Sequence, residues 1–171
     1  MVFGVVMANE RVSMSEISHK SIAAQTYNAC WDLLERPRTP SEDLALIELA
    51  YTSRYHWKQI GGPQEWAISD WMVSRVYATL GHATLAVAHA AAAHAHDARA
   101  FPAWLIASLH EGSARAALVA NDLASCDASI SAARTALASE SDPADAAYIQ
   151  QQLDEVIGLR HAGNHTPHER Q

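Results

Sequence analysis

Residues 71–98 read WMVSRVYATLGHATLAVAHAAAAHAHDA, a segment typical of a helical hairpin. Pro63, just upstream, suits the first turn of a helix, where its missing N–H costs nothing. Gly81 suits the left-handed position just after a helix end. These two residues bound one helix over about residues 63–80. Because only one or two residues separate it from the alanine-rich segment, the second helix is expected to fold back beside the first.

The second helix of this hairpin begins at His82 or Ala83 and carries small side chains on almost every face. Small side chains at a contact let two helix backbones approach closely. Ala90 and Ala93 are therefore expected to lie against the first helix of the same hairpin. The pattern predicts a thin helix in a central position.

A degenerate copy of the hairpin follows at an offset of about 40 residues. Ala117 stands in place of Tyr77, and Asn121 stands in place of Gly81. Asparagine can adopt the left-handed conformation that the turn requires. The second copy comprises Ala114, Asn121, Cys126, Ile130 and Ala133.

The spacing resembles a tetratricopeptide repeat. The resemblance rests on Ser74, Tyr77, Gly81, Ala86 and Ala93. Three residues depart from the repeat: Asp70, Ala90 and Ala98 stand where a large apolar residue, an aromatic residue and a proline are usual. The stretch 39–159 also resembles bacterial tetratricopeptide-like proteins that carry segments similar to residues 53–57 and 74–77, a group with no activity to carry over. The resemblance implies a right-handed superhelix of helical hairpins.

The whole chain is predicted to be all-α, with about seven helices arranged as three antiparallel hairpins and a closing helix. Thr39 and Glu42 form a capping-box signature, and Asp122 and Asp142 are further helix starts. The expected helices span about 17–35, 40–60, 63–80, 83–98, 101–121, 122–139 and 143–159. Residues 15–160 are expected to form a single domain. Residues 1–14 are interpreted as disordered or as preceding the true start, and residues 161–171 as a disordered tail.

Composition and charge exclude several classes of function. The 171 residues are 49% apolar but only 7% aromatic, and about one in five is alanine, which favours close-packed helices. A net charge of −7 argues against a nucleic-acid partner. No segment suits a membrane span or a secretory signal. Cys30 and Cys126 lack CxxC spacing and are read as buried thiols in the cytoplasm.

The ten histidines do not form a convincing metal site. His110 and Glu111 begin a zincin-like motif, but Ala114 occupies the position of the second histidine. A composite metal or small-molecule site near His56, His89 and Glu111 is the alternative hypothesis. The favoured interpretation packs His56 beside Trp57 and makes His89 a hydrogen-bonded interior residue. No catalytic residue, cofactor or metal ligand is predicted.

The predicted function is a protein or peptide interaction module. In tetratricopeptide proteins the first helix of each hairpin lines the concave face, and this resemblance implies a binding surface. Its predicted residues are Trp71, Arg75, Glu111 and Arg115, flanked by Ile68 and Leu118. An exposed Trp71 beside two arginines would suit an acidic or C-terminal segment. A second copy of the chain and the seventh helix are alternative occupants of the groove.

Overall fold

In the computed structural model, the described residues, 18–163, form seven α-helices and one short 3-10 turn, with no strand among them. This confirms the predicted all-α class. The helices are α1 (His19–Leu34), α2 (Pro40–Ile60), α3 (Pro63–Thr79), α4 (Ala83–His94), α5 (Ala103–Val119), α6 (Leu123–Leu137) and α7 (Pro143–Gly163). The 3-10 turn η1 (Ala98–Ala100) lies between α4 and α5.

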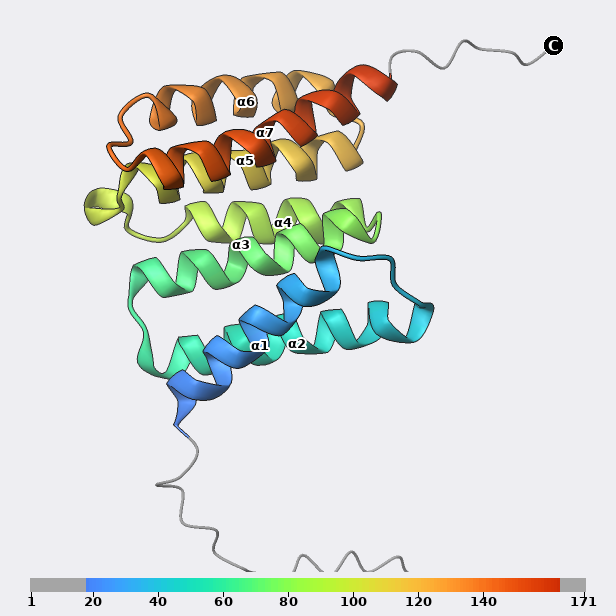
Figure 1. The fold of residues 1–171 in the computed structure, drawn as a ribbon, viewed down its shortest axis with the longest axis vertical. Coiled ribbons are helices and arrows are strands. Elements are labelled where there is room, and N and C mark those ends of the chain that lie inside the picture. Colours follow the sequence, from blue (N-terminus) through green and yellow to red (C-terminus); the bar gives the residue numbers. More distant parts are fainter. Residues whose placement is uncertain (1–17, 164–171) are drawn as a thin grey trace, which may run out of the picture.

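Consecutive helices pack in pairs: α1 on α2, α3 on α4, and α5 on α6. The three pairs are stacked along the long axis of the molecule, and α7 lies over α5 and α6 (Figure 1). Contacts between pairs run from both α1 and α2 to α3, and from both α3 and α4 to α5, while α7 contacts both α5 and α6. The first helix of each pair and α7 meet on one side of the stack.

The helix starts follow from local sequence. At the start of α2, the Thr39 hydroxyl accepts a hydrogen bond from the Glu42 N–H, and the Glu42 carboxylate accepts one from the Thr39 N–H at 2.8 Å. The Asp122 carboxylate accepts the Ser125 N–H at 3.0 Å at the start of α6. The Asp142 carboxylate accepts an N–H at 2.8 Å in the first turn of α7. These side chains satisfy N–H groups that have no partner within the helix.

The predicted internal repeat is present in the backbone. The starts and ends of α5 and α6 follow those of α3 and α4 at an offset close to 40 residues, as in Pro63 and Ala103. Gly81 and Asn121 both adopt the left-handed conformation, with φ of 78° and 58°. Both turns therefore reverse the chain in the same way, although only one of them uses glycine.

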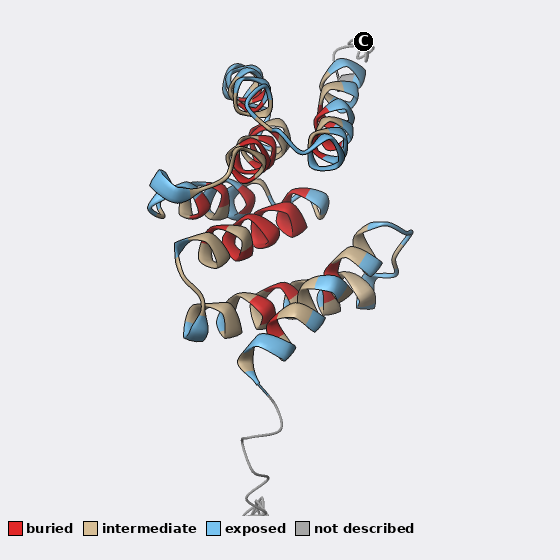
Figure 2. Ribbon diagram, turned by 60° about the vertical axis from the view of Figure 1, so that its left-hand side comes forward, coloured by how far each residue is buried: buried red, intermediate tan, exposed pale blue. Residues whose placement is uncertain are grey.

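Burial is greatest in the middle of the stack, in α3 and α5 (Figure 2). The thin helix α4 buries Ala86, Ala90 and Ala93, as predicted. The Ser74 hydroxyl donates a hydrogen bond of 2.8 Å to the Ala86 carbonyl and so links α3 to α4. A small residue at position 74 is needed because the two helices approach closely there.

Several predicted boundaries change. The fourth helix ends at His94 rather than near Ala98, and η1 follows it. Helix α7 continues to Gly163, so the first residues of the predicted tail are helical. The predictions for residues 1–14 and 164–171 lie outside the described residues. None of the helices within residues 18–163 is long and apolar enough to cross a membrane.

Replacing Ala93 by leucine is expected to lower the free energy of unfolding by about 1–3 kcal/mol, because the larger side chain overpacks the contact of α4. Ala93 is 1% exposed, whereas Ala88 on the same helix is exposed. Urea unfolding of Ala93→Leu and the matched Ala88→Leu measures the difference. Equal effects of the two substitutions would contradict the observed burial.

Candidate functional site

A pocket of about 310 Å³ lies between α1, α3, α5 and α7. It is lined by Tyr27, Trp31, Ile68, Trp71, Trp104, Leu105, Ser108, Asp145, Tyr148, Ile149 and Gln152. Helix periodicity brings these side chains together, because residues three or four positions apart share one face. The pairs with this spacing are Tyr27 and Trp31, Ile68 and Trp71, Trp104 and Ser108, and Asp145 and Tyr148.

Trp31 is the centre of the aromatic lining. Its ring centroid lies 6.4 Å from that of Tyr27, 5.9 Å from that of Trp71 and 6.4 Å from that of Tyr148. The corresponding interplanar angles are 71°, 43° and 65°. These are tilted and edge-to-face contacts, so the rings of Tyr27, Trp71 and Tyr148 pack around that of Trp31.

Trp71 is only 6% exposed, so the prediction that this tryptophan is exposed is wrong. Trp31 of α1 covers one side of it, and the backbone of α5 at Gly112 lies against its edge. A Cβ at position 112 would lie 2.5 Å from Trp71 Cδ1, so Gly112 leaves the space that the indole occupies. The Trp71 Nε1–H is buried and has no acceptor within residues 18–163. The Nε1 faces the α5 backbone, since a Cβ at Gly112 would lie 2.7 Å from it, so this donor does not open into the pocket.

Arg75 lies next to the aromatic lining and is 8% exposed. Its guanidinium carbon is 4.8 Å from the Trp31 ring centroid and 5.7 Å from that of Trp71. Its Nη1 lies 3.3 Å from the Oε1 of Glu111, a carboxylate with no exposed surface. The guanidinium therefore stacks on two rings and pairs with an acid at the same time.

The carboxylate of Glu111 also pairs with Arg115, one turn further along α5. The Arg115 Nη2 lies 2.8 Å from the carboxylate of Glu155 and donates a 3.0 Å hydrogen bond to the carbonyl of Gln152. We call Arg75, Glu111, Arg115 and Glu155 the charge chain. Its two positive and two negative charges cancel, and it ties α3 to α5 and α5 to α7.

The charge chain removes the basis for the predicted recognition of a carboxylate. Neither Arg75 nor Arg115 is free, because each is paired with an acidic side chain. Of the other predicted residues, Ile68 lines the pocket with Trp71, and Leu118 packs against a separate core cluster formed by α5, α6 and α7. The six predicted residues therefore do not form one exposed surface.

The pocket residues of α1 and α7 were not predicted. These helices lie outside the two aligned copies of the hairpin, so the repeat pattern carried no information about them. A weak signal exists in α7, where Asp145, Tyr148 and Gln152 share one face at spacings of three and four. Tyr148 is 50% exposed and is the sole aromatic residue of α7.

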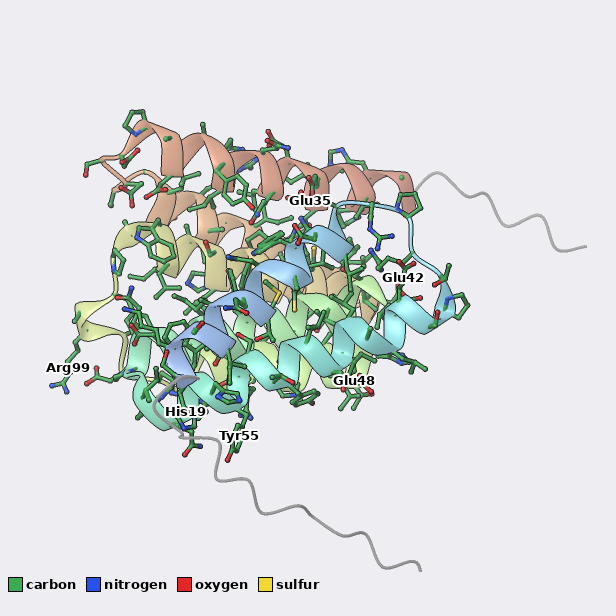
Figure 3. All side chains as sticks on the ribbon, turned by 60° about the horizontal axis from the view of Figure 1, so that its bottom comes forward. His19, Glu35, Glu42, Glu48, Tyr55 and Arg99 are labelled. Carbon is green, nitrogen blue, oxygen red and sulfur yellow. The ribbon has the colours of Figure 1, made fainter. Side chains whose placement is uncertain are left out.

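The composite site of His56, His89 and Glu111 is not formed. The Nδ1 atom of His56 lies 2.9 Å from that of His19, which begins α1 beside α2 (Figure 3). His89 is a hydrogen-bonded interior residue, as favoured, with Nε2 2.9 Å from the Tyr51 hydroxyl. Within the described part of the chain, no three His, Cys, Asp or Glu side chains are placed to hold a metal ion.

Asp70, the residue that departs most from the repeat pattern, is the centre of a second polar cluster. It is 1% exposed and pairs with Arg54 and, at 2.9 Å each, with Lys58 and His96. The Nδ1 of His89 lies 3.7 Å away. Burial alone would raise the pKa of Asp70, but the hydrogen bonds from Arg54, Lys58 and His96 and the nearby His89 ring hold it well below its ordinary value. The cluster joins α2, α3 and α4.

Comparison with known proteins yields no matching family model, curated protein or solved structure. A functional assignment for this chain therefore depends on the geometry and chemistry of the site itself. The aromatic pocket is the feature from which that assignment can start.

Replacing Glu111 by glutamine is expected to lower the free energy of unfolding by about 3–5 kcal/mol, because it leaves buried Arg75 and Arg115 without their shared acid. The matched control is Glu155→Gln at the half-exposed end of the charge chain, with an expected loss below about 1 kcal/mol. Urea unfolding at neutral pH compares the two variants. Similar losses would show that Glu111 does not hold the arginines.

Asp70 is expected to make stability depend on pH in acid. Below its unfolded pKa of about 3.9, the unfolded chain binds a proton at Asp70 that the folded protein does not bind. Stability is therefore lost as pH falls, by up to about 1.4 kcal/mol per pH unit from this group. The variant Asp70→Asn lacks this contribution. The difference in free energy of unfolding between the wild type and the variant should therefore become smaller as pH falls below about 4. Urea unfolding at a series of acidic pH values tests this, and a constant difference would contradict it.

Proposed function

We propose that this chain is an interaction module of the tetratricopeptide-like type that binds a peptide or protein segment. The aromatic pocket receives one large side chain of that segment. The observation that carries the proposal is a pocket with five aromatic rings in its lining. Aromatic residues in desolvated pockets supply most of the binding free energy in many interfaces.

The size of the pocket supports a side-chain ligand. Its volume of about 310 Å³ is at the lower end of the range of about 300–1,000 Å³ for ligand sites. Such a volume suits one large side chain better than a cofactor. The proposal accordingly assigns no reaction to the chain.

The internal repeat supports the tetratricopeptide-like part of the proposal. In a superhelix of that type, the first helix of each hairpin lines the concave face. Here the first helices α1, α3 and α5 contribute side chains to one pocket, and α7 completes it. The two left-handed turns at Gly81 and Asn121 support the same arrangement of helical hairpins.

The state of the cysteines supports a cytoplasmic location. Cys30 and Cys126 are both free and buried. Burial raises the pKa of the Cys30 thiol to about 12, which keeps it protonated and unreactive at neutral pH. Free thiols persist in compartments that are kept reducing.

Selection from a synthetic random-peptide library that includes modified side chains tests the proposal. Replacing Tyr148 by alanine is expected to lower the affinity for the selected peptides about tenfold, because it removes one wall of the pocket. The side chain is half exposed, so the fold should be retained. Titration calorimetry measures the affinities, and circular dichroism checks the helicity.

The matched control is Tyr55→Ala. Tyr55 is 60% exposed and projects outward from α2 (Figure 3), and it does not line the pocket. This substitution should leave peptide affinity unchanged. Failure to select any peptide, or equal effects of the two substitutions, would refute binding at the pocket.

A further inference from the structure

We propose that the side chain received by the pocket is an N-methylated ammonium, of the kind carried by methylated lysine. The inference rests on the proposed function, because it names the chemistry of the residue that enters the pocket. It is carried by the orientation of the aromatic rings, by the charge balance around them and by the position of Asp145 in the lining.

The aromatic rings are placed to hold a cation. The face of an aromatic ring is negative, and several faces set at angles surround a cation better than one ring does. Arg75 already stacks on Trp31 and Trp71 from its side of the pocket. Tyr27, Trp104 and Tyr148 have no cation over their faces within residues 18–163, so these rings remain for a ligand.

The charge balance favours a cation over an anion. Asp145 is the one charged residue in the lining, and it has no ion pair with any residue that the structure describes. Arg75 does not add a net positive charge, because the charge chain to which it belongs is neutral. The lining therefore carries one negative charge without a cationic side-chain partner among the described residues, in the first turn of α7, in a protein whose net charge is −7.

The kind of cation follows from hydration. A primary ammonium is compact and strongly hydrated, so it enters an apolar pocket only if buried polar groups replace its water. The Ser108 hydroxyl donates to the Trp104 carbonyl and keeps only its oxygen as an acceptor, and Asp145 is exposed, so neither residue replaces the full hydration shell of a primary ammonium. A methylated ammonium holds its water more weakly and presents methyl groups to the ring faces. It can thus occupy the aromatic part of the pocket while its charge interacts with Asp145.

Two probes of equal shape test the proposal. One is Nα-acetyl-trimethyllysine methylamide, and the other is its uncharged analogue, in which a tert-butyl group replaces the trimethylammonium group. The cation is expected to bind about fivefold or more tightly than the analogue, because only the cation interacts with the ring quadrupoles and with Asp145. Calorimetric titration of the full chain measures both affinities.

Three variants separate the contributions. Asp145→Asn should lower the affinity for the cationic probe severalfold and leave the affinity for the uncharged probe unchanged. Asp154→Asn is the matched control, since Asp154 is an exposed acid of α7 that bonds to Gln150 and does not line the pocket. Tyr148→Leu should lower the affinity for the cationic probe more than the affinity for the uncharged probe, because leucine keeps apolar bulk but has no aromatic face. Helicity and thermal unfolding of each variant confirm that the fold is retained.

The outcomes separate this inference from the proposed function. The inference would be overturned if the two probes bound with equal affinity and Asp145→Asn changed neither affinity. The proposed function would still stand if selected peptides bound at the pocket. Selected peptides that bind at the pocket but are not displaced by the cationic probe would also overturn it. If neither the probes nor any peptide bind, both proposals fall.

Discussion

The buried carboxylate of Glu111 is the constraint on which the relative positions of three helices depend. A carboxylate without exposed surface is stable only if its partners replace the water it has lost. Arg75 of α3 and Arg115 of α5 supply partners for its Oε1, whereas its Oε2 is buried without a hydrogen-bond partner within residues 18–163. Arg115 extends the contact to Glu155 of α7. A shift of α3 relative to α5 would leave Arg75 buried and unpaired, which makes the spacing of these two helices a condition of folding. The half-exposed Glu155 attaches α7 less tightly.

The pocket is a consequence of that spacing. Arg75 must reach Glu111, and in that position it fixes the rings of Trp31 and Trp71 by stacking on them. Attachment of α7 through Arg115 brings Tyr148 and Asp145 to the lining. The polar contacts thus hold four helices around a volume that a purely apolar interface would close by packing.

The features that could be predicted from the sequence are those set by local interactions. Capping residues act within one turn, and the left-handed turns at Gly81 and Asn121 depend on one residue each, so helix starts and the repeat were predictable. Burial of Arg75 and Glu111 was not predictable in this way, because it depends on the packing of α1 and α7 over α3 and α5. From spacing alone, Glu111 and Arg115 suggest an ordinary exposed helix pair.

The two copies of the hairpin share a frame but differ at the positions that build the site. Trp71 and Glu111 are equivalent in the repeat, as are Arg75 and Arg115. In each copy the arginine contacts the residue one turn before it: Arg75 stacks on an aromatic ring, whereas Arg115 pairs with a carboxylate. If both copies carried tryptophan, neither arginine would have a buried acid, and if both carried glutamate, the pocket would lose one of its five aromatic rings. The pocket and the charge chain that supports it therefore coexist because the copies diverged at this one pair of equivalent positions, while their turns and small-residue contacts kept the helices in register.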